Sequence, residues 1–189
     1  ANKNAKFKDI PSSFDSTKNY INTFLPFLIQ ETYDQVQNSL SYVVEDDTFD
    51  LHVNAVTQVD DFRLIKCATN DRSISTKISE LDLVILEQNG NSIYGKINAI
   101  IPKGKDVYFD IMVSWTGNAR RMAANGSSIR CTRVMSLVTN YREYIALVSL
   151  DFIPFKRDII NCSGVHVASP TKPEIERIKN RYLVNESQA

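Results

Sequence analysis

Six short apolar or alternating segments between residues 51 and 138, with no helical pattern between them, constrain the fold more than any other feature. Turn residues such as Asn89-Gly90 and Gly104-Lys105 separate these segments, and such pairs are typical of hairpins. Antiparallel strands joined only by turns leave long edges unless the sheet closes. We therefore predict a small antiparallel β-barrel of five to six strands, with an open sandwich half as the alternative. The expected strands are Leu51–Thr57, Phe62–Ala68, Leu81–Leu86, Ile93–Ile101, Val107–Trp115 and Ser128–Val138.

Helical patterns lie on both sides of these strands. Before them, apolar residues recur at spacings of three and four, and Pro26 predicts a division into a short helix and a longer one that begins near the proline. After them, Asn140 followed by Glu143 resembles a capping box that starts a second long helix. We expect the two helices to run antiparallel and bury their apolar stripes against each other. These stripes are Ile21, Leu25, Ile29, Tyr33, Val36, Leu40 and Val43 in the first helix, and Tyr141, Tyr144, Ile145 and Val148 in the second.

The sequence thus predicts a mainly β protein with helices, of α+β class, in which the barrel is inserted between antiparallel stalk helices. The expected boundaries are 1–45 for an N-terminal segment with the first helix, 46–138 for the barrel, 139–161 for the second helix, and 162–189 for a linker and a last helix.

Composition restricts the class of protein. The chain has 189 residues, 43% of them hydrophobic and 23% charged, which is typical of one globular core with an appended element. No apolar segment approaches the roughly 20 residues of a membrane span. The lysine-rich start has no apolar stretch behind it, so it does not resemble a secretory signal and we expect an intracellular protein.

The cysteines and histidines show no spacing typical of metal ligands. Cys67, Cys131 and Cys162 lie far apart, and neither His52 nor His166 lies at a ligand spacing from them. We expect no metal site, and we interpret the cysteines as buried, reduced thiols.

Charge is balanced overall but uneven along the chain. There are 22 basic and 22 acidic residues in total, yet residues 31–92 carry a net charge of −8 and residues 93–134 a net charge of +5. The second stretch is a candidate surface for a polyanion, with an ordinary solvated face as the alternative.

The usual catalytic motifs are absent from the sequence. It has no GxxxxGK[ST] phosphate loop, no GxGxxG, no HExxH and no GxSxG. The acidic pairs Asp46-Asp47 and Asp60-Asp61 fall in predicted turns, where such pairs are usually solvated turn formers. We therefore expect no catalytic residue in this chain.

The basic stretch combines cations with aromatic rings. Lys103 and Lys105 precede Tyr108, while Arg120 and Arg121 follow Trp115. Cations that neutralise phosphates and rings that stack on bases are the equipment of barrels that bind single strands. Alternation along a strand predicts that Tyr108 points outward and that the core face holds Phe109, Ile111, Val113 and Trp115.

Three segments resemble a known family. The segment Thr132–Tyr144, which contains Thr139-Asn140-Tyr141-Arg142-Glu143-Tyr144, is similar to the junction between accessory barrel and stalk in senataxin-type superfamily 1B helicases. Tyr20–Gln30, with Phe24-Leu25-Pro26-Phe27-Leu28, resembles the first stalk segment of that family, and Glu174–Ala189 resembles the approach to its ATPase core. The barrel itself diverges.

The resemblance implies a function for each part of the chain. It implies an N-terminal bracing segment and first stalk helix, an accessory barrel, a second stalk helix and a segment that leads to the ATPase core. The family's Asn-x-x-Gln adenine-recognition motif maps onto Asn185 and Gln188. The implied whole protein is a nuclear helicase that uses ATP and Mg²⁺ to unwind RNA·DNA or RNA duplexes, in R-loops and in transcription termination. The downstream ATPase domains and single-stranded RNA or DNA would be its partners, and this chain alone would be inactive.

Two hypotheses of different classes remain. The first is a non-catalytic accessory fragment of an ATP-dependent helicase, whose barrel modulates the grip on nucleic acid through Lys103, Lys105, Arg120, Arg121 and Tyr108. The second is a self-contained protein-interaction module whose acidic surface docks a basic partner. A phosphate-binding loop downstream of Ala189 would distinguish them.

Overall fold

The structure is a computed structural model that describes residues 10–43, 48–114 and 122–161. The chain divides into two compact units. The larger unit spans Ile21–Leu150, and the smaller one contains the chain up to Tyr20 and from Asp151 onward. We describe each unit by itself.

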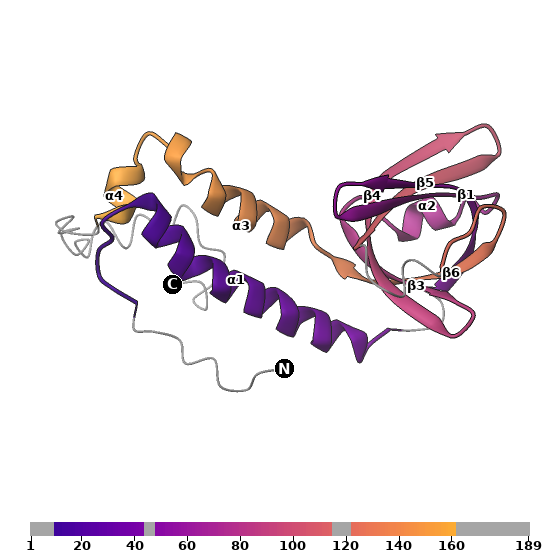
Figure 1. The fold of residues 1–189 in the computed structure, drawn as a ribbon, viewed down its shortest axis with the longest axis horizontal. Helices are drawn as coiled ribbons and strands as arrows, with labels where there is room; N and C mark the ends of the chain where they lie inside the picture. The colour runs from indigo at the N-terminus through magenta and orange to yellow at the C-terminus, as the bar shows by residue number, and fades with distance from the viewer. Residues whose placement is uncertain (1–9, 44–47, 115–121, 162–189) are drawn as a thin grey trace, which may run out of the picture. The chain divides into compact units, whose positions relative to one another are not determined.

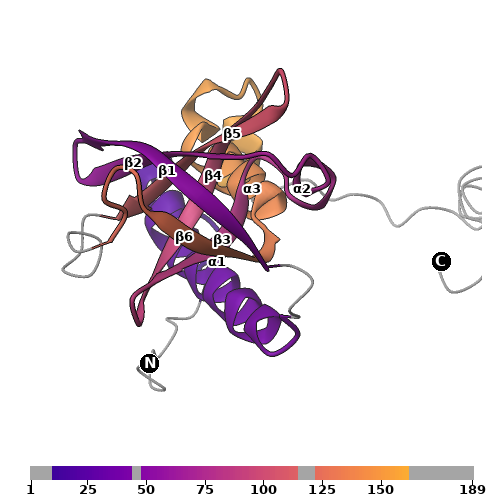
Figure 2. The same ribbon diagram turned by 90° about the vertical axis from the view of Figure 1, so that its right-hand side faces the viewer.

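Six antiparallel strands of the larger unit form a closed barrel in the order β1-β2-β5-β4-β3-β6, with β6 paired back to β1 (Figures 1 and 2). This confirms the predicted fold class. Closure removes the unpaired edges that an open sheet would leave. The strands are β1 (Thr48–Val59), β2 (Phe62–Thr69), β3 (Asp82–Gln88), β4 (Asn91–Lys103), β5 (Asp106–Ser114) and β6 (Ser128–Ser136).

Alternate side chains of each strand fill the barrel. In β5, Phe109, Ile111 and Val113 are buried in the core, whereas Tyr108 lies on the other face and is half-buried. The predicted alternation is therefore confirmed for these residues, and Trp115 lies outside the described residues. The core also holds Ile74 from a four-residue helix, α2 (Ile74–Lys77), that the sequence pattern did not predict.

The first helix, α1, runs unbroken from Thr17 to Leu40 and contains Pro26 (Figure 1). The predicted division at the proline is therefore wrong. Proline removes one backbone donor from a helix. The remaining hydrogen bonds and the half-buried face on either side of Pro26 sustain the helix through this position.

The second helix, α3 (Val138–Val148), lies beside α1 and runs antiparallel to it (Figure 1). We call residues 21–40 of α1 together with α3 the stalk. Asn140 is not a cap as predicted: Leu137 precedes the helix, and Asn140 is buried within it. Its side-chain amide donates to Thr32 at 3.0 Å and to Gln35 at 2.9 Å.

The predicted apolar contact between the two helices is partly wrong. Ile29 and Tyr33 are 60% and 44% exposed, and Tyr144 and Ile145 are also exposed. Leu25, Val36 and Leu40 of the predicted stripe are half-buried, and the half-buried face of α1 also includes Leu28, Thr32, Gln35 and Ser39. The side of α1 that meets α3 is therefore more polar than the predicted stripe.

The smaller unit contains the start of α1, the last two residues of a 3-10 turn, η2 (Leu150–Phe152), and a short helix, α4 (Lys156–Ile160). The amide of Phe14 donates to the carbonyl of Ile160 at 2.9 Å, and the Phe14 ring packs edge-on against Tyr20. The two ends of this unit are thus held together by a buried aromatic residue and a backbone bond.

Among the helices in the described ranges, none combines the length and the apolar character that crossing a membrane requires.

Candidate nucleic-acid interface

The β4–β5 hairpin places two of the predicted cations at one tip. Lys103 ends β4, Lys105 lies in the turn, and both side chains are exposed. Gly104 between them has a φ of +62°, a conformation that glycine adopts without strain. Neither lysine forms an ion pair with a residue in the described ranges, although Asp106 lies directly opposite Lys103 in the ladder. The tip therefore carries a small excess of positive charge.

Tyr108 lies on the outer face of the barrel near the base of this hairpin. It is opposite Ile101 on β4 and Ala68 on β2, so the three side chains form one row across the sheet. Ile101 is 50% exposed, whereas Tyr108 is half-buried. The side chains of Tyr108 and Ile101 together offer an apolar contact beside the lysines, which is the combination that a base and its phosphate require.

Tyr108 also contributes to the lining of a surface pocket of about 460 Å³. Asp50 and Asp106 contribute carboxylates to its lining, and His52 contributes an imidazole. Carboxylates repel phosphate, so this pocket does not extend the basic surface.

The other predicted site residues lie outside the described residues. These are Arg120 and Arg121, and the adenine-motif residues Asn185 and Gln188. Their roles stay predictions. The structure therefore brings together only Lys103, Lys105 and Tyr108.

Acidic side chains also gather around Arg130 and at the β1–β2 turn of the barrel. Arg130 on β6 lies between Asp50 on β1 and Glu87 on β3 in the strand register, and all three line a pocket of about 520 Å³. At the β1–β2 turn, Asp60 and Asp61 are exposed next to Val59 and Phe62, which are also exposed. Glu45, Asp46 and Asp47 lie outside the described residues.

The stalk carries an apolar groove that the sequence did not predict. Its volume is about 350 Å³, and its lining includes Leu25 and Leu28 of α1 and Tyr141 and Tyr144 of α3. Lys96 on β4 borders the groove, with its ammonium 5.9 Å from the centre of the Tyr141 ring. The pairing of Lys96 with Tyr141 depends on the angle between barrel and stalk, so no local pattern could have revealed it.

The two described cysteines are unsuited to chemistry. Cys67 and Cys131 are fully buried in the barrel core. Burial raises the pKa of Cys67 to about 12, and burial together with the nearby Cys67 thiol raises the pKa of Cys131 well above its ordinary value. The thiolate is the nucleophilic form, so neither residue can act as a nucleophile at neutral pH. Among the residues that the structure describes, no three His, Cys, Asp or Glu side chains are grouped to hold a metal ion.

Comparison with known proteins points to helicases. The chain is similar to Helicase SEN1 of Saccharomyces cerevisiae, with 23% identity over 203 residues that cover 97% of this chain. The chain spans 9% of the length of that relative. No family model matches the chain. The similarity thus marks a region related to a part of a helicase, and in this chain the region forms a barrel flanked by helices.

Proposed function

We propose that this chain is the stalk and accessory barrel of an ATP-dependent RNA/DNA helicase, and that the barrel modulates the grip of the enzyme on single-stranded nucleic acid. The observation that carries the proposal is the similarity to Helicase SEN1 along 97% of the chain, which includes the closed barrel and both stalk helices. The parent enzyme would be nuclear and would unwind RNA·DNA or RNA duplexes. ATP and Mg²⁺ would bind in domains that follow this region, where Asn185 and Gln188 would contribute to adenine recognition.

The barrel would act through its β4–β5 hairpin. Lys103 and Lys105 would neutralise phosphates, and Tyr108 with Ile101 would contact a sugar or base beside them. Arg120 and Arg121 would add two cations from the segment that follows β5. Contacts of this kind do not read base edges, so they would change the dissociation rate and processivity of the helicase more than its sequence preference.

Two experiments test this function. The first reads the coding sequence downstream of Ala189. A glycine-rich loop ending in Lys-Ser or Lys-Thr within a few tens of residues is expected, and a stop codon would refute the proposal.

The second experiment measures the rate at which a single strand dissociates from the whole helicase. One variant carries Lys103→Glu with Lys105→Glu, and another carries Arg120→Glu with Arg121→Glu. Each pair should speed dissociation.

A matched control carries the same change in net charge at exposed helix positions, Lys18→Glu with Arg142→Glu. These residues lie on α1 and α3, away from the hairpin in sequence, and the control should dissociate as the unmodified enzyme does. Equal effects of the hairpin pair and the control would show that only total charge matters, and would remove the hairpin from the proposed interface.

A second candidate function is a protein-interaction module with an acidic docking surface. The exposed β1–β2 turn favours it, because Asp60 and Asp61 lie next to exposed Val59 and Phe62 and could receive a basic, partly apolar segment. Asp60→Lys with Asp61→Lys would weaken the binding of such a partner without changing the binding of nucleic acid. A stop codon after Ala189 would favour this function over the first.

A further inference from the structure

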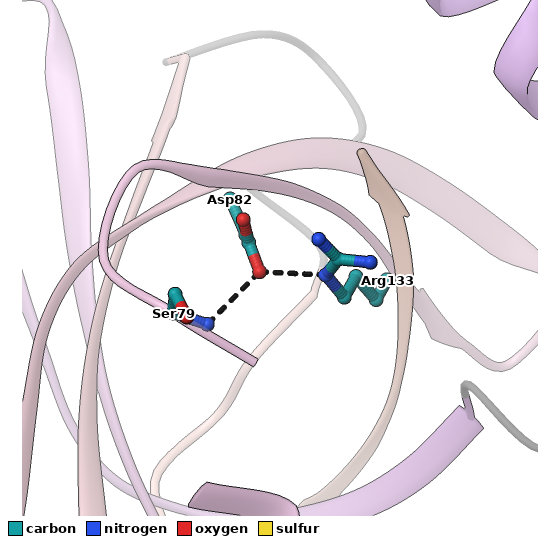
Figure 3. A network of polar contacts seen from close by, with 3 residues as sticks. All are labelled: Ser79, Asp82 and Arg133. Atoms are coloured by element: carbon teal, nitrogen blue, oxygen red, sulfur yellow. Dashed lines mark hydrogen bonds and ion pairs between the residues drawn. The ribbon is translucent and has the colours of Figure 1, made fainter. Parts of the chain in front are cut away.

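The carboxylate of Asp82 is the most deeply buried charged group that the structure describes. Its side chain is 1% exposed, and one oxygen, Oδ2, accepts a hydrogen bond from Arg133 Nε at 2.7 Å and another from the amide of Ser79 at 2.9 Å (Figure 3). The other oxygen, Oδ1, has no protein partner among the described residues. A buried carboxylate depends on its few partners, so Arg133 and Ser79 determine where Asp82 can lie.

Leu81, the residue before Asp82, has an unusual backbone conformation. Its φ is +67°, in the left-handed region that costs free energy for any bulky residue with a Cβ atom. The turn that contains it is closed by Asp82, whose amide donates to the carbonyl of Ser79 at 3.1 Å while its carboxylate accepts from the Ser79 amide. Leu81 is thus held in a strained conformation by the residue on its C-terminal side.

The backbone of Leu81 joins the barrel to the stalk. Its amide donates to the carbonyl of Ile97 on β4 at 2.8 Å, and its carbonyl accepts from the amide of Leu137 at 2.9 Å. Leu137 immediately precedes α3, and its own carbonyl accepts the first hydrogen bond of that helix from Tyr141. The residue that precedes α3 is therefore hydrogen-bonded to one strained residue, in addition to its covalent connection to β6.

A third strand completes the arrangement. Arg133 lies on β6 where the β3–β6 register changes between Leu83 and Val84, so that Leu83 pairs with Met135 and Val84 with Arg133. This bulge leaves Val134 without a register partner and brings the Arg133 side chain to Asp82. β6 then leads directly to Leu137 and α3.

We propose that the Asp82–Arg133 pair is a latch that keeps the strained Leu81 turn closed and thereby fixes the start of α3 on the barrel. Opening the latch would release the Leu137 amide from Leu81 and let the stalk helix pivot while the barrel stays folded. Arg133 and Asp82 are positioning residues in this proposal. It depends on no nucleic-acid contact, so it stands or fails independently of the proposed function.

Amide hydrogen exchange in the full 189-residue chain, followed by NMR, tests the latch. We call the amides of Leu81 and Leu137 the junction. Arg133→Gln should speed exchange at the junction by about tenfold more than at the β5 amides of Val107–Val113, because local opening exposes only the junction. The matched control is Arg130→Gln, the same change three residues earlier on β6, at a side chain that makes no ion pair with a described residue. In the control, any acceleration of amide exchange should be the same at the junction as at the β5 amides. Equal acceleration at both places in Arg133→Gln would overturn the latch and indicate a general stabilising pair.

A second pair of variants tests the strain itself. Leu81→Gly and Leu81→Ala both remove the side chain, but only glycine adopts the positive φ at no cost. The latch predicts that Asp82→Asn, which weakens the bond to Arg133 and keeps an acceptor for Ser79, opens the junction about tenfold more in the alanine background than in the glycine background. Leu81→Gly alone should also protect the Leu137 amide better than Leu81→Ala alone, a comparison that needs no change at the pair. Equal exchange in the alanine and glycine variants would refute the proposal.

Discussion

The side-chain amide of Asn140 on α3 donates a hydrogen bond to the hydroxyl of Thr32 on α1 at 3.0 Å, although 108 positions separate the two residues. The same amide donates to Gln35 at 2.9 Å, and the Thr32 hydroxyl donates onward to the carbonyl of Leu28. This polar chain joins the two helices of the stalk where the sequence had predicted an apolar contact. Asn140 is buried, so its partners are not exchanged freely for water.

Asn140→Ala should therefore destabilise the chain by about 1–3 kcal/mol, because the variant loses two part-buried hydrogen bonds and leaves the half-buried side-chain oxygen of Gln35 without this donor. Urea unfolding measures the change. The control is Thr139→Ala at the exposed neighbour on the same helix, for which we expect a change within about 0.5 kcal/mol. Equal midpoints for the two variants would show that the polar chain contributes nothing to the stalk.

Gly95 on β4 tests the packing of the barrel. A Cβ at this position would lie 2.8 Å from Ile111 Cγ2 and 3.2 Å from Val113 Cγ1, and both side chains are buried and branched at Cβ. Neither methyl group can move without a change of rotamer or backbone. Gly95→Ala should thus cost about 1–3 kcal/mol by overpacking. Ser92→Ala, at an exposed position of the same strand, should be nearly neutral, and a neutral Gly95→Ala in the same thermal melts would contradict the tight packing.

The sequence predicted the barrel because its determinants are local. Period-two alternation and turn residues such as Asn89-Gly90 act over a few positions, and all six predicted strands appear within a few residues of their expected bounds. Closure followed from the cost of unpaired edges. The inward face of β5 was predicted for the same reason, because alternation alone assigns Phe109, Ile111 and Val113 to one side.

The stalk could be predicted only in part, because its contacts depend on tertiary placement. Apolar spacing located both helices, but it selected Ile29 and Tyr33, which are exposed, and passed over Thr32 and Gln35, which bond to Asn140. Pro26 suggested a break, yet the helix continues through it. For the candidate site, the two lysines and Tyr108 were found from local composition. The two residues of the Asp82–Arg133 pair are 51 positions apart and meet at a bulge, so no local sequence pattern predicts the pair.

The two buried thiols should make the free energy of unfolding fall at alkaline pH. The pKa of Cys67 rises from its ordinary 9.0 to about 12 in the folded chain, and that of Cys131 also rises. Above pH 9 the unfolded chain releases these protons while the folded chain keeps them, so the stability that is present below pH 9 falls as the pH rises. Each thiol should lower the free energy of unfolding by about 1.4 kcal/mol per pH unit in this window.

Urea unfolding at pH 8 and pH 10 measures this loss. Cys67→Ala with Cys131→Ala is less stable at both values, but it should lose less stability between them than the unmodified chain does. An equal loss in both proteins would show that other groups cause the alkaline destabilisation.

The purified chain should neither hydrolyse ATP nor bind it measurably. The sequence contains no phosphate-binding loop, and phosphate and magnesium contacts supply most of the binding energy of a nucleotide. Gln188 alone could contribute only adenine contacts. A thermal melt with and without Mg²⁺-ATP should give the same midpoint. Stabilisation by the nucleotide would reveal a site that the sequence does not predict.

The last prediction concerns the salt dependence of single-strand binding by the 189-residue chain. Its net charge is zero, so the protein as a whole does not attract a polyanion, and any attraction must come from local groups. Lys103, Lys105, Arg120 and Arg121 can neutralise at most four phosphates. With a slope near −0.7 per neutralised phosphate, the logarithm of the affinity against the logarithm of the salt concentration should fall no more steeply than about −3.

Fluorescence anisotropy with a labelled single-stranded oligouridine gives this slope directly. Binding should be weak at low salt and lost at physiological salt, and Lys103→Glu with Lys105→Glu should flatten the slope by the two lost contacts. Asp50 and Asp106 oppose any further contact beside Tyr108, because their carboxylates line the adjacent pocket. A slope much steeper than −3 would mean that a larger basic surface exists elsewhere in the chain, and an unchanged slope in the lysine variant would move the interface away from the β4–β5 hairpin.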